Sequence, residues 1–225
     1  MVRRHGFKRF EGTLASPTFF NSIPLQMPHR MILLRLGYRE SRTELSGDRR
    51  DALAQTMSDG FALCRPQGCW RRLAIAEHGD ERVVLEDGTV LESESLAKLL
   101  QRSTAAAIFA ATAGPDIVQA AADAATAEDG VKAVIYDAVG GQTAEAAISW
   151  INDFVRQQLS RSGEGMTKHR FSPGYGDLRL ETQRDIHRLL ELDRLGVSLT
   201  SSCMLIPEKS VTAVAGIEPM RSAEE

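Results

Sequence analysis

The chain is organised around one stretch, Arg170-Phe171-Ser172-Pro173-Gly174-Tyr175-Gly176. Pro173 fixes its own φ angle and pushes the preceding residue toward extended backbone, while Gly174 and Gly176 let backbone amides approach a ligand without an intervening Cβ. Arg170 supplies a planar fork of donors that suits a carboxylate, and Tyr175 supplies a ring with a polar tip. A Pro-Gly pair alone mostly marks an ordinary turn, so the segments on either side decide what this loop does.

Two amphipathic helices are expected to flank this loop. The upstream helix, Thr143–Gln158, has apolar residues at helical spacing, and Thr143 is a suitable N-cap. Glu145 would lie in its first turn, off the apolar stripe, where the helix dipole also favours an ordinary solvated carboxylate. The downstream helix, Leu180–Leu195, would end at Gly196.

Shorter elements are expected elsewhere in the chain. Asp87-Gly88 favours the type I′ turn of a hairpin over residues 82–91. The apolar run over 105–114 is most simply a buried strand, whereas 130–139 fits a helix or a buried strand and Gly140-Gly141 interrupts its pattern. The remaining expected elements are helices over 48–63, 96–102 and 116–126, a strand over 71–77, and a strand pair formed by 199–206 and 211–217. No G-x-G-x-x-G follows a strand, which argues against a dinucleotide-binding fold.

Composition is typical of a soluble globular protein with one main core. Of 225 residues, 43% are hydrophobic and 25% are charged, and the formal net charge of −3 gives no reason to expect nucleic acid or an anionic membrane as a partner. No apolar run approaches the ~18 residues needed to span a bilayer. The three cysteines lack a C-x-x-C pair, and they fit reduced, buried thiols of a cytoplasmic protein better than a disulfide or a metal site.

Residues 1–30 differ from the rest in being basic and rich in proline. Proline breaks regular structure, and the segment has no continuous apolar core of the kind a secretory signal needs. It is therefore expected to be a disordered extension, or to lie upstream of a true start at Met27 or Met31. The folded domain is expected over 31–217, with a polar, flexible tail over 218–225.

The loop and the residues after it resemble the activation domain of cobalamin-dependent methionine synthase, the module that binds S-adenosylmethionine. The shared order is Arg170-x-x-Pro-Gly-Tyr175, an amphipathic helix, then Leu199-Thr200-x-Ser202 and Pro207-x-x-Ser210-Val211. Upstream, Ala144-Glu145-Ala146 followed by Val155-Arg156 is similar to the family's Ala-Glu-Ala and Val-Arg helix. The resemblance is strong over roughly 143–217 and looks like that of a free-standing member. It implies an α+β fold with helices packed on a mainly antiparallel sheet.

The resemblance also implies a ligand site. By their positions in the motifs, Arg170 and Glu145 bind S-adenosylmethionine, and the backbone around Ser172, Pro173 and Gly174 contacts the same ligand. Tyr175 lies where the corrin ring of cobalamin is presented. The resemblance implies no catalytic nucleophile, no general base and no metal ligand in this chain.

The implied function is reactivation of a cobalamin-dependent methionine synthase in trans, by reductive methylation of cob(II)alamin. Cobalamin would be carried by the partner subunit, and flavodoxin or an equivalent donor would supply one electron. The chain would then be a cytoplasmic component of a methyltransferase in methionine biosynthesis rather than a complete enzyme. Two alternatives stay open: an accessory module for another corrinoid methyltransferase, and a protein that binds S-adenosylmethionine without delivering a methyl group.

Three features depart from the family pattern. Phe171 stands in place of a proline, and Arg179 stands where a proline often opens the next helix. The segment 211–217 runs directly into the tail, whereas full-length enzymes continue into a longer hairpin with a Tyr-Tyr pair that contacts the ligand. The missing hairpin predicts weaker ligand binding, or a wall of the site that a partner completes.

Overall fold

A computed structural model describes residues 16–38 and 46–220. The strands are β1 (Thr18–Phe20), β2 (Gln67–His78), β3 (Arg82–Leu85), β4 (Val90–Glu92), β5 (Ala105–Thr112), β6 (Glu164–Met166), β7 (Ser198–Leu199), β8 (Leu205–Ile206) and β9 (Ser210–Pro219). The helices are α1 (His29–Arg35), α2 (Gly47–Leu63), α3 (Glu94–Leu100), α4 (Asp116–Thr126), α5 (Gly130–Arg161) and α6 (Gln183–Leu190), with short 3-10 helices η1 (Leu180–Thr182) and η2 (Leu192–Leu195).

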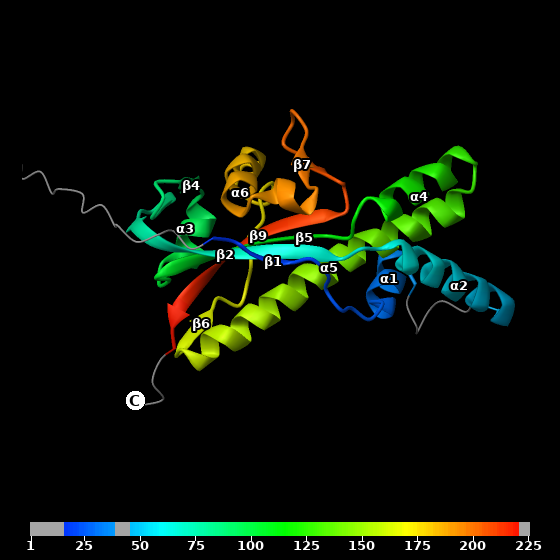
Figure 1. Cartoon of the computed structure of the whole chain (residues 1–225), viewed down its shortest axis with the longest axis horizontal. Coiled ribbons are helices and arrows are strands. Elements are labelled where there is room, and N and C mark those ends of the chain that lie inside the picture. Colours follow the sequence, from blue (N-terminus) through cyan, green and yellow to red (C-terminus); the bar gives the residue numbers. More distant parts are fainter. Residues whose placement is uncertain (1–15, 39–45, 221–225) are drawn as a thin grey trace, which may run out of the picture.

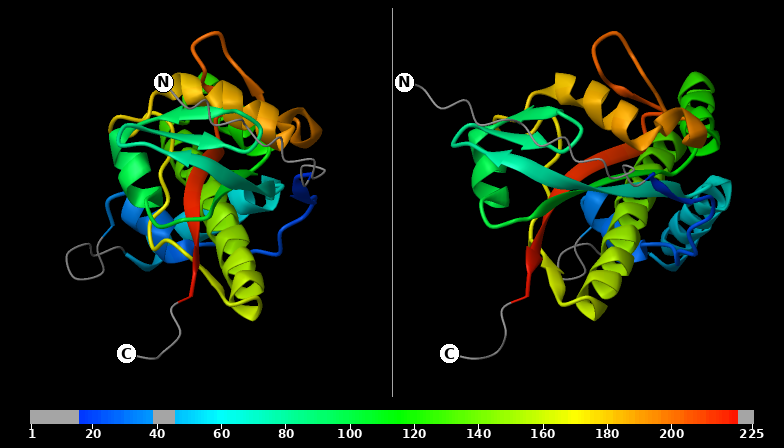
Figure 2. Two further views of the ribbon diagram at one scale, coloured as in Figure 1. Left: turned by 90° about the vertical axis from the view of Figure 1, so that its left-hand side faces the viewer. Right: turned by 60° about the vertical axis from the view of Figure 1, so that its left-hand side comes forward.

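The main sheet is antiparallel, with strand order β4-β3-β2-β5-β9-β6 and β1 paired to β2. Figures 1 and 2 show the long helix α5 crossing one face of this sheet, with α3 and α6 on the other. The helices α1, α2 and α4 gather around the first half of α5, beyond the end of the sheet (Figure 1). The expected α+β arrangement of helices on a mainly antiparallel sheet is confirmed.

The central strand β5 is buried along its whole length. Side chains alternate along a strand, so Ala106, Ile108 and Ala110 pack toward α3 and α6, whereas Ala107 and Phe109 pack toward α5. A strand covered on both faces reads as a continuous apolar run, which is why the sequence over 105–114 predicted it correctly.

Helix α5 is continuous where the sequence predicted an interruption. The expected break at Gly140-Gly141 and the expected N-cap at Thr143 are both wrong, because Thr143 is fully buried inside the helix. The true cap is Asp129, whose carboxylate accepts a hydrogen bond from the backbone N–H of Lys132 at 3.0 Å.

Close packing explains why α5 keeps its glycines. A Cβ added at Gly140 would lie 2.9 Å from Cγ of Lys209 and 3.3 Å from the side chain of Ile117 in α4. The glycine thus lets α4 and the start of β9 approach the helix. We infer that this packing offsets the cost of glycine in a helix, which is about 1 kcal/mol relative to alanine.

The C-terminal third is divided differently from the expected helix and strand pair. The helix predicted over 180–195 is broken at Glu191, which has a positive φ of 53° between α6 and η2. The predicted pairing of 199–206 with 211–217 is wrong. Leu199 pairs with Leu205 in the small β7–β8 hairpin, whereas β9 pairs with β5 and β6. The middle of β9 is apolar on both faces, with Val214 in one core cluster and Ala213 and Ala215 in the other. A position inside the main sheet, between β5 and β6, buries both faces.

The folded part also begins earlier than residue 31. Strand β1 pairs with β2 through Thr18, Phe19 and Phe20, and Ile23 is buried against the sheet and α5. Residues 16–30 therefore pack on the domain despite their prolines, since their apolar side chains cover part of its core. Residues 1–15 of the extension expected over 1–30 lie outside the described residues. At the other end, β9 continues to Pro219.

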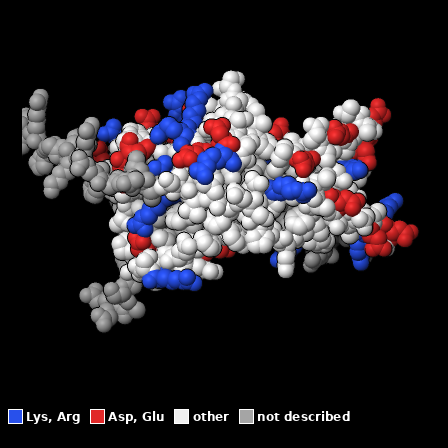
Figure 3. Space-filling view, viewed as in Figure 1, with Lys and Arg blue, Asp and Glu red and all other residues white. Residues whose placement is uncertain are grey.

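The surface carries charges of both signs. On the face shown in Figure 3, basic and acidic side chains are interspersed around an uncharged central area. Within residues 16–38 and 46–220, no helix combines the length and the apolar character that crossing a membrane requires.

Candidate ligand groove

A groove of about 1220 Å³ opens beside the loop that follows β6. Its lining comes from segments far apart in the sequence: the start of α4, the middle of α5, the loop 170–175, the start of α6, the β7–β8 hairpin and the start of β9. Figure 1 shows α6 and the β7 hairpin on one side of the start of β9, and α4 on the other.

Arg170 is held at one wall of the groove by α5. Its Nη1 donates to the backbone oxygen of Ile148 at 3.3 Å, and its Nη2 donates to Oγ of Ser149 at 3.4 Å. Burial lowers the pKa of Arg170, while the nearby carboxylate of Glu145 raises it. A guanidinium starts from so high a pKa that it stays charged at neutral pH. The groove therefore contains a fixed, half-buried cation.

Glu145 places an anion beside this cation. It lies one helical turn before Ser149 on α5, so it shares the face of the helix that Arg170 contacts, and its side chain is exposed to the groove. The expectation that Glu145 lies in a first turn is wrong, because α5 begins at Gly130. The helix dipole consequently gives no account of this carboxylate. A cation and an anion on adjacent parts of one wall suit a zwitterionic ligand.

The loop after Arg170 is fixed to β9. The backbone N–H of Phe171 donates to the oxygen of Val214, and the N–H of Val214 donates back, both at 2.8 Å. Gly174 has a φ of +87°, and its N–H donates to the oxygen of Leu178 at 2.8 Å. Such a φ is strained for any residue with a side chain, so glycine is what allows this turn.

The far end of the same loop is fixed to α3. Oδ1 of Asp177 accepts a hydrogen bond from the hydroxyl of Ser93 at 2.8 Å, and Oδ2 accepts one from the backbone N–H of Ser95 at 3.1 Å. These donors, the Ser95 N–H first, lower the pKa of Asp177 to about 2. Attachment at both ends holds the loop in place before any ligand arrives.

The structure brings most of the predicted site residues to one cavity. Of the predicted site residues, those that line the groove are Arg170, Glu145, Ser172, Pro173 and Tyr175. Gly174 does not line it and instead shapes the turn. Tyr175 is 73% exposed, so its ring stands at the rim.

Several groove residues were not predicted. Lys209 lines the groove while its Nζ pairs with the carboxylate of Asp137 on α5. Gln183 lines it too, and its Oε1 accepts a hydrogen bond from Oγ1 of Thr212 at 2.8 Å. Lys209 lies within the Pro207-x-x-Ser210-Val211 motif, but the motif does not predict which way its side chain points. Its position against α5 follows from the pairing of β9 with β5.

The three cysteine thiols of the chain are shielded from solvent. The three cysteines are free and buried, and burial raises the pKa values of the Cys64 and Cys69 thiols, that of Cys69 to about 12. In the part of the chain that the structure describes, no group of three or more His, Cys, Asp or Glu side chains could hold a metal ion.

Comparisons with known proteins agree with this architecture. The family model described as "Vitamin B12 dependent methionine synthase, activation domain" matches residues 97–222, more than half of the 225 residues. None of the curated proteins compared with the chain matches it. Among solved structures, the chain is similar to the MetH reactivation domain bound to AdoHcy, with a TM-score of 0.62 and 19% sequence identity over 88% of this chain and 75% of that chain. At this identity, the likeness shows a shared fold.

Proposed function

We propose a function from the premise that this chain belongs to the family of vitamin B12-dependent methionine synthase activation domains. The chain binds S-adenosylmethionine in the groove and supports reductive methylation of cob(II)alamin on a methionine synthase that acts in trans. One observation carries this proposal: Arg170 and Glu145, which lie within the family-matched region, line the same groove side by side.

The groove fits the chemical groups of S-adenosylmethionine. Arg170 offers a charge-assisted, forked contact to the carboxylate, and Glu145 offers an opposite charge to the amine and the sulfonium. Phe171 and Val211 provide apolar surface for the adenosine. At about 1220 Å³ the groove exceeds the roughly 300–1,000 Å³ of most ligand sites. A bound ligand would consequently leave part of the groove open toward a partner.

The rim of the groove supports a corrinoid partner. Tyr175, Met204 and Ile206 all line it and are 73%, 54% and 46% exposed, which leaves an apolar edge in water. Cobalamin, carried by the partner, would supply the methyl-accepting chemistry when bound. Flavodoxin or an equivalent donor would provide one electron, and S-adenosylhomocysteine would be left in the groove. Residues of this chain hold the ligand, orient its methyl group toward the rim and exclude water. This role belongs to a component of a cytoplasmic methyltransferase system.

A methyl-transfer assay tests the proposal. The chain is mixed with a methionine synthase that lacks its own activation domain and holds cob(II)alamin, together with a reductant and S-adenosylmethionine labelled in the methyl group. We expect label on the cobalamin and a return of methionine synthesis. Arg170→Met should lower both, whereas Arg179→Met, which changes an arginine whose side chain is 70% exposed, should lower neither.

The same assay separates the alternatives. Ligand binding without transfer to any corrinoid protein would assign a binding-only role. Transfer to a different corrinoid methyltransferase, but not to methionine synthase, would assign another partner.

A further inference from the structure

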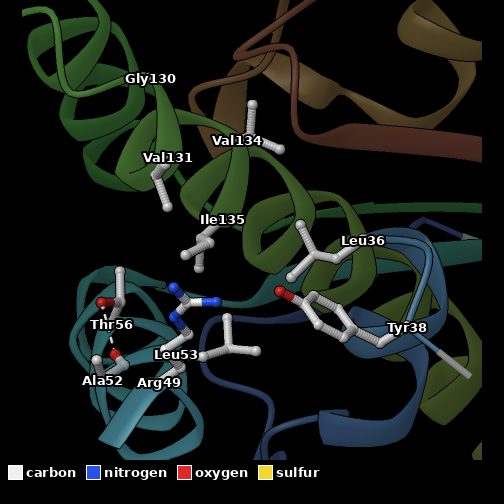
Figure 4. Close-up of a pocket in the computed structure, with 10 residues that line it drawn as sticks. All are labelled: Leu36, Tyr38, Arg49, Ala52, Leu53, Thr56, Gly130, Val131, Val134 and Ile135. Atoms are coloured by element: carbon white, nitrogen blue, oxygen red, sulfur yellow. Dashed lines mark hydrogen bonds between the residues drawn. The ribbon is translucent and has the colours of Figure 1, made fainter. Parts of the chain in front are cut away.

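A second cavity lies away from the groove and shares no lining residue with it. It has a volume of about 680 Å³ and is formed by the end of α1, the first half of α2 and the first turns of α5. That volume is within the roughly 300–1,000 Å³ range of small-molecule sites. Figure 4 shows its walls, with Val131, Val134 and Ile135 of α5 opposite Leu53 of α2.

Most of this cavity is apolar and partly open to water. Val131 and Val134 are 75% and 59% exposed, while Leu53 and Ile135 beneath them are buried. Val131, Val134 and Ile135 have the spacing of one helix face, so their side chains form a continuous strip. An apolar ligand seated on this strip would remove it from water.

Two polar groups face the same space. In Figure 4, the hydroxyl of Tyr38 points toward the guanidinium of Arg49 across the cavity. Arg49 is an exposed residue of the first turn of α2, and its side chain lines the cavity. The hydroxyl of Thr56, by contrast, is engaged within its own helix, where it donates to the oxygen of Ala52 at 2.9 Å. The donors available to a ligand are therefore gathered at the Arg49 end.

We propose that this cavity binds a small organic anion with an apolar body, of the class of aliphatic or aryl-substituted monocarboxylates. The carboxylate would contact Arg49 and Tyr38, and the apolar body would cover the Val131–Ile135 strip. The site is separate from the groove and does not depend on the function proposed for it.

The test uses octanoate and 4-phenylbutyrate as probes, titrated into the whole chain by calorimetry, with octanol as the uncharged comparison. The carboxylates are expected to bind at least roughly tenfold more tightly than octanol, as a charge-assisted contact provides. Arg49→Met should remove most of that preference. Arg50→Met is the matched control, since it removes a neighbouring exposed arginine that does not line the cavity. Val134→Asp should weaken binding of all three probes.

Several outcomes would overturn the proposal. They are an absence of carboxylate binding at millimolar concentrations, binding that Arg49→Met and Val134→Asp leave unchanged, or displacement of the carboxylates by S-adenosylmethionine. Circular dichroism of each variant shows whether it is folded. Arg49, Arg50 and Val134 are all exposed, so the three substitutions should leave the fold intact.

Discussion

Substituting alanine at Gly140 or at Gly141 tests why α5 carries adjacent glycines. The two positions share one helix and the same chemical change. A Cβ at Gly141 would meet no atom within 4 Å, whereas a Cβ at Gly140 would lie 2.9 Å from Cγ of Lys209. The two variants should therefore change the free energy of unfolding in opposite directions.

The magnitudes follow from two effects. Alanine in place of a helical glycine stabilises by about 0.5–1 kcal/mol, and Gly141→Ala should gain this amount. Gly140→Ala should gain the same, but crowding Lys209 and Ile117 should cost about 1–3 kcal/mol, as overpacking usually does. The effect of helix propensity is the same in both variants and cancels when their free energies of unfolding are subtracted. The remaining difference, about 1–3 kcal/mol, is the cost of crowding Lys209 and Ile117.

Thermal unfolding measured by circular dichroism reads this difference. At roughly 2–4 °C per kcal/mol for a chain of this size, Gly140→Ala should melt about 2–12 °C below Gly141→Ala. Gly140→Ala should also weaken S-adenosylmethionine binding, because Lys209 lines the groove. Equal melting temperatures for the two variants, or a higher one for Gly140→Ala, would refute the packing explanation for the continuous helix.

Two further predictions concern titrating groups. The folded pKa of Asp177, about 2, is below its ordinary value of 3.8, so its contribution to stability is present above about pH 3.8 and is lost as the pH falls through about 2. Chemical denaturation across this range should show a weaker pH dependence for Asp177→Asn, and superimposable profiles would contradict the anchoring role. Cys69, whose pKa burial raises to about 12, should resist iodoacetamide in the folded chain and react after unfolding, as followed by mass spectrometry. Rapid native alkylation at Cys69 would contradict its burial.

The sequence predicted correctly those elements whose ends are determined by residues directly beside them. The hairpin around Asp87-Gly88 was predicted correctly, and Gly88 adopts the positive φ that its turn requires. The type I′ assignment is wrong, because that turn needs a positive φ at both central residues and Asp87 does not have one. The bounds of α4 match the predicted 116–126 because Pro115 directly precedes its first turn.

Non-local packing decided the features that the sequence mispredicted. A glycine pair is usually a breaker, and only the approach of Lys209 and Ile117 shows why α5 continues through it. Likewise, the strand that pairs with β9 lies about a hundred residues earlier, so proximity in sequence wrongly favoured the segment 199–206 as its partner.

Part of the candidate site could be predicted because its residues belong to motifs that occur in the same order along the chain as in the family. Arg170 and Glu145 were identified through those motifs, and the structure brings them to one groove, while their role in ligand binding stays a prediction. Lys209 and Gln183 carry no such signal. They enter the site through the position of β9 and through the hydrogen bond between Thr212 and Gln183.

Calorimetric titration of S-adenosylmethionine tests the central claim most directly, with the unaltered chain, Arg170→Met and the Arg179→Met control measured side by side. We predict saturable binding that Arg170→Met weakens by about 1.5–3 kcal/mol, roughly tenfold to a hundredfold, and that Arg179→Met leaves unchanged. An absence of saturable binding at millimolar ligand, or binding of the same strength in Arg170→Met, would contradict the assignment of the groove.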